Sequence, residues 1–352
     1  MSLPADPRRI LVIRRDNIGD LVLTTPLIHG LRSHFPKTWV GVLGNTYNTP
    51  ILNAHPDIDG LFAYDKAKHQ PQRLRLAVYV DTARLLLRLR AMRIDIAILA
   101  GPGVQRQAAQ LAGWIKPRAI LGFVIAGAPS QVTLPVAYGD GASLHEAEDV
   151  FRLGATLGIT GAPGPCCLGA DAGAAARLRQ ALPPGARGRR LVALHISARR
   201  PRQRWPAAAF AALMRELMAR EDVFLLLLWA PGASADPRHP GDDEKAAAIL
   251  ALLGAHAGCL LWPTHTLASL TGALAACELM VCADGGAMHV AAGLGVPVVA
   301  LFGDSPVWRW RPWGVPHEVL QAPAGDVADI TVSSVRAACE RLLEGKPVAQ
   351  AG

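Results

Sequence analysis

The feature that most constrains the fold is a repeated alternation between short, unbroken apolar runs and longer segments of helical character. In the first half the apolar runs lie at 8–14, 39–44, 60–64 and 95–100, and the predicted helices lie at about 18–34, 47–54 and 72–93. Unbroken runs of this length are typical of parallel strands buried on both faces, because a strand with one face in water alternates apolar and polar residues. The sequence therefore predicts an α/β domain with a doubly wound parallel sheet.

The same alternation returns in the second half, after a change of composition. Residues 160–190 are dominated by Gly, Pro and Ala and contain one Ala-rich helical stretch, which is typical of a linker. Beyond it, apolar runs lie at 191–197, 223–230, 278–284 and 296–303, and predicted helices lie at 207–220, 243–253 and 287–294. No sequence repeat links the halves, so we expect two Rossmann-like domains facing across a cleft, with ligands beyond the carboxyl ends of the strands.

The charge distribution indicates an anionic partner for the first half. The 352-residue chain has a formal net charge of +8, and residues 1–160 carry 18 basic against 12 acidic side chains, whereas 161–352 carry 18 against 16. No nucleic-acid-binding motif or aromatic platform accompanies the charge, which disfavours a nucleic-acid partner. No apolar run reaches the roughly 18 residues of a membrane-spanning helix, and the N-terminus has no signal-peptide core, so we expect a cytoplasmic protein.

The turn from Arg14 to Asp20 is the first candidate site, because it joins a predicted strand to a predicted helix. Asn17 is suited to cap the helix, Gly19 leaves room for a substrate, and Asp20 falls in the first helical turn, where backbone N–H groups lack helical partners. The alternative interpretation of Asp20 is ordinary stabilisation of a helix N-terminus. The adjacent strand end, glycine turn and arginines favour a turn that faces a cleft.

The segment from Asp284 to His289 is the second candidate site. Gly285 and Gly286 let backbone N–H groups at a helix start approach a phosphate, and His289 can donate to the same anion. Asp284 is itself negative and fits a sugar hydroxyl better than a phosphate. The alternative interpretation is a plain strand-to-helix turn with His289 on a helix face.

The basic segment 195–206 is the third candidate site, and it also follows a predicted buried strand. Its four arginines within six positions are Arg199, Arg200, Arg202 and Arg204, and Trp205 and Pro206 follow them. Guanidinium groups bind phosphate oxygens in a bidentate manner, so the segment suits a diphosphate leaving group. A solvated basic loop is the alternative interpretation.

Several other classes of site are disfavoured. The segment 101–103 lacks the third glycine of a dinucleotide-binding turn, which argues against a nicotinamide enzyme. Asp57 and Asp59 form a D-x-D pair without a His or Glu companion, so we expect no essential metal. The six cysteines show no C-x-x-C spacing and are interpreted as reduced core or loop residues.

The stretch 73–93 carries six arginines and one acidic residue, a composition suited to contact with an anionic membrane. Its leucines occur on all sides of the predicted helix. A partly buried helix whose arginines extend to solvent is therefore an equally good interpretation.

Three segments of the chain resemble glycosyltransferase family 9, the lipopolysaccharide heptosyltransferases. They read ILVIRRDNIGDLVLTTPLIHGLRSHFP with HPDIDGLFAYD, then GPGVQRQAAQLAGWIKPRAILGF, then ADGGAMHVAAGLGVPVVALFGDSP. They follow the order of the family, and the match runs from about residue 9 to 345. The N-terminal G-D turn together with the C-terminal D-x-G-x-x-H segment makes the resemblance specific.

The resemblance implies a GT-B fold with an acceptor domain at 1–165, a linker at 166–190, a nucleotide-sugar donor domain at 191–330 and a last helix within 331–352 that packs back on the first domain. It also implies inverting transfer of heptose from an ADP-sugar to the lipid A–core oligosaccharide at the cytoplasmic face of the inner membrane, without a cofactor. The sequence gives no indication of oligomeric state, so a monomer is expected by default.

The resemblance and the candidate turns together give each site residue a role. Asp20 matches the proposed general base of the family, and the acceptor is expected at Arg14, Asn17, Gly19 and Arg106. The donor is expected at Ser197, Arg199, Arg202, Arg204, Glu244 or its neighbour Asp243, Asp284, Gly285, Gly286 and His289.

Two positions depart from the family pattern. A lysine that contacts the donor is usual two residues before the Trp-Pro pair, and here that residue is Gln203. The hydroxyl residue usual after Asp284 is Gly285. A transferase of the same fold with another nucleotide-sugar, and a non-catalytic nucleotide-sugar-binding protein, are therefore the alternatives; a dinucleotide oxidoreductase is disfavoured.

Overall fold

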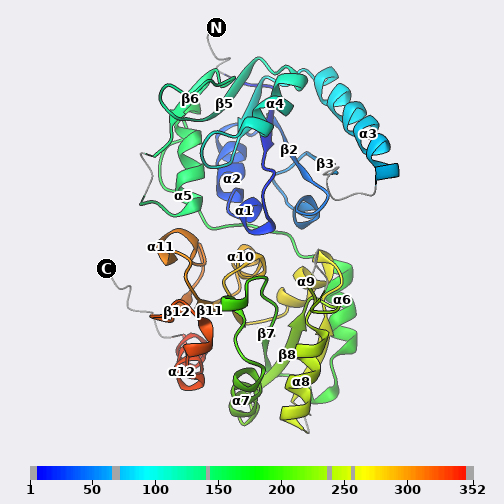
Figure 1. Cartoon of the computed structure of the whole chain (residues 1–352), viewed down its shortest axis with the longest axis vertical. Coiled ribbons are helices and arrows are strands. Elements are labelled where there is room, and N and C mark those ends of the chain that lie inside the picture. Colours follow the sequence, from blue (N-terminus) through cyan, green and yellow to red (C-terminus); the bar gives the residue numbers. More distant parts are fainter. Residues whose placement is uncertain (1–5, 66–71, 140–142, 236–239, 255–257, 346–352) are drawn as a thin grey trace. The chain divides into compact units, whose positions relative to one another are not determined.

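The computed structural model describes residues 6–65, 72–139, 143–235, 240–254 and 258–345 (Figure 1). The chain divides into two compact units, Met1–Leu168 and Gly169–Gly352. The outer ends of the expected domains, residues 1–5 and 346–352, lie outside the described residues. None of the helices in the described part of the chain is long and apolar enough to cross a membrane.

The first unit contains a six-stranded parallel sheet with helices packed on it, in the order β3-β2-β1-β4-β5-β6. Its strands are β1 (Arg9–Ile13), β2 (Trp39–Asn45), β3 (Gly60–Tyr64), β4 (Ile96–Leu99), β5 (Ala119–Val124) and β6 (Leu134–Ala137). Its helices are α1 (Ile18–Val22), α2 (Thr25–His34), α3 (Gln72–Ala91), α4 (Arg106–Ile115) and α5 (Glu146–Phe151), with 3₁₀ turns η1 (Thr49–Leu52) and η3 (Arg152–Leu157). The single helix expected at 18–34 is divided into two because Pro26, which fits only a first helical turn, starts α2.

The second unit repeats the same strand order, β9-β8-β7-β10-β11-β12. Its strands are β7 (Arg190–His195), β8 (Val223–Trp229), β9 (Cys259–Pro263), β10 (Leu279–Ala283), β11 (Val298–Phe302) and β12 (His317–Gln321). Its helices are α6 (Ala172–Ala181), α7 (Ala207–Met218), α8 (Asp243–Leu253), α9 (Leu267–Leu274), α10 (Gly286–Gly293), α11 (Val307–Trp310) and α12 (Val332–Leu343), with 3₁₀ turns η4 (Pro184–Ala186), η5 (Pro201–Gln203) and η6 (Val327–Asp329). Two doubly wound parallel sheets are therefore present, as the apolar runs predicted.

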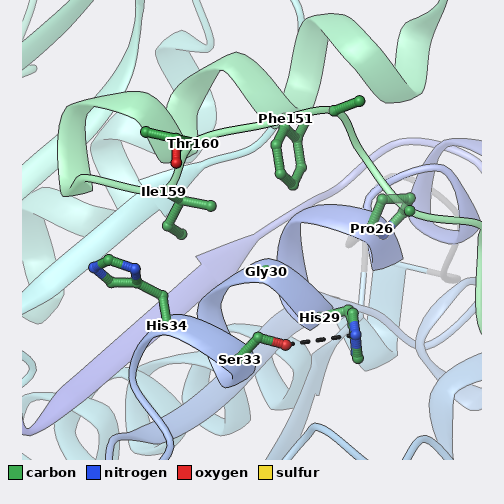
Figure 2. Close-up of a pocket in the computed structure, with 10 residues that line it drawn as sticks. Pro26, His29, Gly30, Ser33, His34, Phe151, Ile159 and Thr160 are labelled. Atoms are coloured by element: carbon green, nitrogen blue, oxygen red, sulfur yellow. Dashed lines mark hydrogen bonds between the residues drawn. The ribbon is translucent and has the colours of Figure 1, made fainter.

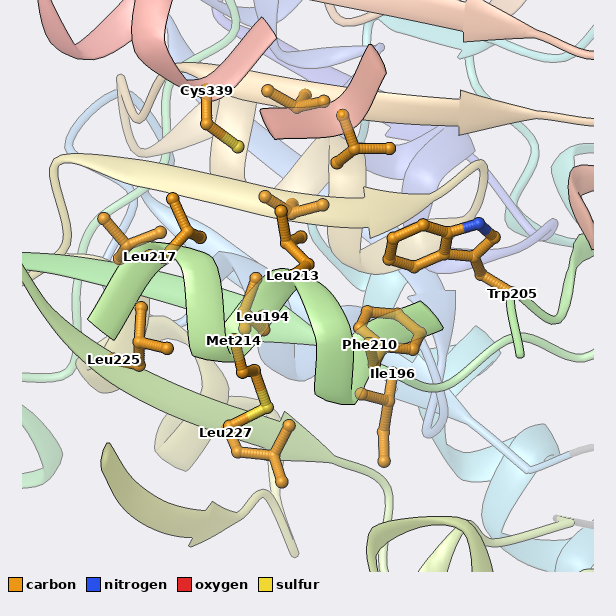
Figure 3. Close-up of a cluster of buried hydrophobic side chains, with 14 of the residues drawn as sticks. Leu194, Ile196, Trp205, Phe210, Leu213, Met214, Leu217, Leu225, Leu227 and Cys339 are labelled. Carbon is orange, nitrogen blue, oxygen red and sulfur yellow. The ribbon is translucent and has the colours of Figure 1, made fainter. Parts of the chain in front are cut away.

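The core of the second unit shows how the sheet fixes its functional edge. Figure 3 shows Leu213 and Leu217 of α7 packed over Leu225 of β8, all fully or almost fully buried. At the end of this layer the Trp205 ring lies 4.9 Å from the Phe210 ring, and its indole N–H donates to the Ile330 carbonyl at 2.9 Å. Burial of this indole anchors the segment that carries the arginines.

The expected linker and the expected last helix both contribute to the second unit. Most of the segment 166–190, expected as a linker, belongs to that unit, because α6 packs on α9 so closely that a side chain at Gly272 would lie 2.6 Å from the Ala174 methyl group. A last helix within 331–352 was expected to pack back on the first domain, and that packing stays a prediction. The buried side chains Val335, Ala338, Cys339 and Leu343 of α12 join the core of the second unit, where α12 packs on α7.

Candidate active site

The turn after β1 places Asp20 where the strand order of the first sheet reverses. β1 and β4 are neighbours at this point, and ligands of open α/β sheets bind beyond the carboxyl ends of such strands. Asp20 is the third residue of α1, and its Oδ2 accepts hydrogen bonds from the backbone N–H of Asn17 at 2.9 Å and from Asn17 Nδ2 at 3.1 Å. The capping role considered for Asp20 is therefore real, and it fixes the carboxylate at the edge of the sheet.

A buried arginine holds the other oxygen of Asp20. Arg14 Nη2 donates to Asp20 Oδ1 at 2.9 Å and to Glu146 Oε1 at 2.8 Å, while Arg14 Nε lies 3.1 Å from Asp16 Oδ2. Burial lowers the pKa of Arg14, but the three carboxylates outweigh burial, and the pKa of Arg14 is raised overall. We call Arg14, Asp16, Asp20 and Glu146 the acid–arginine cluster.

The four residues expected at the acceptor occupy different environments. The Arg14 side chain is fully buried and also donates to the Ala100 carbonyl, so it supports Asp20 rather than extending toward solvent. The acceptor contact expected for Arg14 stays a prediction. Asn17 is exposed, Gly19 is buried, and Arg106 is exposed at the first position of α4, after the neighbouring strand β4. Asn17 and Arg106 are thus accessible from the same edge of the sheet.

In the second unit, Gln203 joins the segments that follow three adjacent strands, β7, β10 and β11. Gln203 Nε2 donates to Asp284 Oδ2 at 3.0 Å and to Ser305 Oγ at 3.3 Å, and its side chain is buried. The strand order of this sheet reverses between β7 and β10. The segments expected to bind the donor therefore meet at the place where ligands of this fold class bind.

The turn after Asp284 leaves space in front of a helix N-terminus. The φ angle of Gly285 is 164°, an extended conformation open to any residue, and a side chain there would meet nothing within 4 Å. Gly286 begins α10, whose N-terminal end is favourable for an anion. His289 is buried one turn further on, with its ring 6.4 Å from the Trp310 ring. The expected contact of His289 with an anion at the helix start stays a prediction.

The arginines of the basic segment divide into two groups. Arg199, Arg200 and Arg202 are exposed. Arg204 instead donates to the Ala198 carbonyl at 2.7 Å and forms an ion pair with Asp242. The exposed arginines are accessible to a diphosphate, whereas Arg204 holds the segment in place.

The hydroxyl and carboxylates expected near the donor also have protein partners. Ser197 Oγ accepts a hydrogen bond from the Ala230 N–H at 2.9 Å. Asp243 accepts from Trp229 Nε1 at 2.8 Å and from the Gly232 N–H at 2.9 Å, contacts that lower its pKa. Glu244 is exposed and accepts a hydrogen bond from the Ser234 N–H at 3.1 Å. The contact expected between the donor and Glu244 or Asp243 stays a prediction.

Two residues close to the candidate site turns were not predicted from the sequence. Glu146 contacts Arg14 although the two residues are 132 positions apart in the sequence, and no local motif indicates that contact. Lys245 donates to the Ile196 carbonyl at 2.9 Å and lies 5.0 Å from the centre of the Phe210 ring. Burial is the main cause that lowers the pKa of Lys245 to about 8. The sequence analysis did not single out Lys245, because it lies in a run of charged residues at the start of α8 and such a run usually faces solvent.

A separate pocket of about 330 Å³ lies in the first unit between α2 and the segment 159–164 (Figure 2). His29 lines it, with Nδ1 2.9 Å from Asp57 Oδ2 and Nε2 3.5 Å from Ser33 Oγ. None of the expected site residues lines this pocket. In the D-x-D pair, Asp57 pairs with His29 and Asp59 forms an ion pair with Arg32.

The described residues contain no group of three or more His, Cys, Asp or Glu side chains arranged to hold a metal ion. The six cysteines are unpaired, and five of them are buried, as expected for reduced core residues. Burial raises the pKa of Cys166, Cys259, Cys277 and Cys339 to about 12. These four thiols are therefore poor nucleophiles at neutral pH. That the reaction needs no metal stays a prediction.

Comparison with known proteins gives a consistent result. The chain is 23% identical over 344 residues to lipopolysaccharide heptosyltransferase 3 of Escherichia coli, covering 94% of this chain and 93% of that protein. Its fold is similar to that of a family 9 glycosyltransferase from Veillonella parvula, with a TM-score of 0.80, 20% identity, and coverage of 98% and 99%. It is also similar to that of the E. coli heptosyltransferase WaaC with ADP, with a TM-score of 0.75, 15% identity, and coverage of 95% and 99%.

The expected GT-B fold is confirmed by these structural likenesses and by the two Rossmann-like sheets. The model of glycosyltransferase family 9 (heptosyltransferase) matches residues 82–334. The match covers more than half of the chain, including the turn at Asp284. The chain therefore belongs to glycosyltransferase family 9.

Proposed function

We propose that this protein transfers heptose from ADP-heptose to the lipid A–core oligosaccharide of lipopolysaccharide, with inversion at the anomeric carbon. The observation that carries the proposal is the fixed carboxylate of Asp20 at the reversal point of the first sheet, in a family 9 chain. Two relatives support the choice of sugar and nucleotide. They are lipopolysaccharide heptosyltransferase 3 and the heptosyltransferase WaaC with ADP.

In this proposal Asp20 is the general base. Its carboxylate takes the proton from an acceptor hydroxyl while the oxygen attacks the anomeric carbon, and the bond to the diphosphate breaks on the opposite face. General-base catalysis contributes about 10²–10⁴-fold. Three hydrogen bonds hold the carboxylate, from Arg14 and from the backbone and side chain of Asn17, so its orientation is set before the acceptor arrives.

The second unit binds the donor in this proposal. The N-terminal end of α10 and the exposed side chains of Arg199 and Arg202 stabilise the negative charge that builds on the departing diphosphate. Asp284, held by Gln203, accepts a hydrogen bond from a donor hydroxyl. These groups supply positive potential from the protein itself, so the proposed transfer needs no metal.

The acceptor is anionic and lipid-linked, and α3 offers a surface suited to the membrane that carries it. The helix α3 buries Val78, Leu86 and Leu89 and exposes Leu87 (65% exposed) and Tyr79 (62% exposed). Among its side chains that the structure describes, the arginines Arg84, Arg88 and Arg90 are exposed, and Asp81 pairs with Arg84 at 3.2 Å. Apolar side chains flanked by arginines fit the surface of an anionic bilayer. We therefore place the proposed enzyme at the cytoplasmic face of the inner membrane, as a monomer.

The membrane surface is tested by sedimentation with vesicles that contain anionic phosphatidylglycerol. Leu87→Glu is expected to reduce the bound fraction severalfold, because it puts a negative charge among the arginines of α3. Leu252 is also exposed on a helix, α8 of the second unit, so Leu252→Glu is the matched control and should bind as the wild type does. Equal binding by both variants would remove α3 from this role.

A second candidate is a transferase of the same fold that uses a different nucleotide-sugar. The observation that favours it is Gln203, a neutral amide on Asp284 at the position where a lysine was expected. A panel of ADP-, UDP- and GDP-sugars with purified protein and a heptose-deficient core acceptor decides between the two. Transfer from ADP-heptose alone supports the first proposal. Transfer from another nucleotide-sugar alone supports the second, and no transfer from any donor refutes both.

A further inference from the structure

The acid–arginine cluster contains more negative charge than its arginine requires. One cation, Arg14, faces three carboxylates, and Asp16 and Asp20 already contact its Nε and Nη2. Glu146 adds a third carboxylate with a fully buried side chain, bound to the same Nη2 nitrogen at 2.8 Å. Burying a carboxylate is unfavourable unless a cation is fully available to it, and here that cation is shared. Glu146 therefore shares the guanidinium of Arg14 with two other carboxylates.

The electrostatic effect of Glu146 on the Asp20 carboxylate is opposite to that of its hydrogen bonds. Three hydrogen bonds stabilise the Asp20 carboxylate, and groups that stabilise an anion weaken it as a base. A second carboxylate on the same guanidinium nitrogen acts in the opposite direction, because two neighbouring negative charges each favour protonation of the other. Both oxygens lie within 2.9 Å of Arg14 Nη2, so the two carboxylates are close neighbours.

The remaining charged groups on α5 are directed to other partners. His145 accepts from the Ala147 N–H at 3.1 Å, Glu148 accepts from the His145 N–H at 2.9 Å, and Asp149 pairs with Arg152 at 2.9 Å. From β4, the group that reaches the cluster is the neutral Ala100 carbonyl. Among the described contacts, the charged groups that reach Asp20 directly or through Arg14 are therefore Arg14, Asp16 and Glu146.

We propose that Glu146 is a positioning residue for Asp20: by sharing the Arg14 guanidinium, it limits how strongly that cation stabilises the Asp20 carboxylate and so keeps Asp20 basic enough to accept a proton. This inference rests on the proposed function, in which Asp20 is the general base. It assigns Glu146 an electrostatic effect on the reaction without any contact to a substrate.

The test is the pH dependence of kcat for transfer by the full-length Glu146→Gln variant. Glutamine keeps the size of the side chain and an oxygen acceptor but removes the negative charge. The acid limb of the profile is expected to move to lower pH by about one unit, and the plateau kcat is expected to fall about threefold, with the donor KM unchanged. Glu148→Gln is the matched control on the same helix, and its profile should overlay that of the wild type. A Glu146→Gln profile with an unmoved acid limb would overturn the proposal.

A second measurement does not depend on transfer and keeps the two proposals separate. Infrared difference spectra between wild type and Asp20→Asn report the protonation of Asp20, and Glu146→Gln should lower the pH midpoint of that step. If Glu146→Gln does not fold, the same coupling appears from the other side, because Asp20→Asn should lower the midpoint of Glu146 by an equal amount. Midpoints that do not move overturn the inference. A shifted midpoint in a protein that transfers no sugar refutes the proposed function but not the electrostatic coupling.

Discussion

The turns at Asp20 and Asp284 lie beside the reversal points of two sheets with the same strand order, yet they hold their acidic residue in opposite ways. Asp20 is bound by a buried cation that two further carboxylates share. Asp284 is bound by the neutral amide of Gln203, which also reaches Ser305. The contact to the acidic side chain is thus a buried ion pair at the first turn and a neutral hydrogen bond at the second. One fold holds two acidic side chains at equivalent sheet edges by different kinds of contact.

The largest effect is expected from removing the buried cation. Arg14→Met leaves Asp20 and Glu146 buried without their partner, and breaking a buried ion pair in this way costs about 3–5 kcal/mol of unfolding free energy. Chemical denaturation of the variant and the wild type measures the difference. Arg84→Met removes an exposed arginine paired with Asp81 and should change stability by less than about 0.5 kcal/mol. A loss below 1 kcal/mol for Arg14→Met, on the order expected of surface pairs, would mean that the first edge does not depend on buried ions.

A smaller effect is expected from His195, the last residue of β7, at the edge of the second sheet. Burial is the main cause that lowers its pKa to about 4, with Lys245 as a second cause. Between pH 6.5 and about 4 the unfolded chain therefore binds a proton that the folded chain does not, and folding stability falls as pH falls, by on the order of 3 kcal/mol at the end of this window.

The measurement is the pH dependence of unfolding free energy across that window. His195→Gln cannot titrate, so its stability should fall less steeply than that of the wild type. His34→Gln, which removes an exposed histidine, should leave the wild-type slope unchanged. Equal slopes for His195→Gln and the wild type would show that His195 is not held neutral in the fold.

The smallest effect concerns the neutral contact itself. Gln203→Ala removes the hydrogen bonds to Asp284 and Ser305, and one such contact is worth about 1 kcal/mol. We expect the donor KM to rise about fivefold, with kcat almost unchanged. Gln321 is the matched control, because its Nε2 donates to the Gly303 and Ser305 carbonyls and does not contact Asp284. If Gln321→Ala raises the donor KM as much as Gln203→Ala does, the contact to Asp284 has no particular role.

Among the strands that the structure describes, the sequence predicted seven of the eight interior strands, missing β5, but only one of the four edge strands, β3. β1, β8 and β11 are unbroken apolar runs because both faces of a central parallel strand are covered. β6 and β12 have half-exposed residues and no such run, so no strand was predicted there. The helix α6 was mistaken for part of a linker because its alanines give no strong pattern, although they allow the close approach to Gly272.

The candidate site could likewise be predicted only in part from the sequence. Turns such as 14–20 and 284–289 have local signals in their glycines and charges, and the structure places both beside reversal points. The partners of those turns come from distant segments. Glu146 lies 132 positions from Arg14, and Gln203 lies 81 positions from Asp284. Contacts of this kind depend on how the sheets fold, so one sequence alone does not reveal them.

The most direct measurement of the central claim is sugar transfer by Asp20→Asn. We predict a fall in kcat of about 10²–10⁴-fold with binding of the ADP-sugar preserved, because the residues proposed to bind the donor lie in the other unit. Asp57→Asn is the control within the first unit, since Asp57 pairs with His29 away from the cluster, and it should keep wild-type turnover. Turnover of Asp20→Asn within tenfold of the wild type would contradict the assignment of Asp20 as the general base.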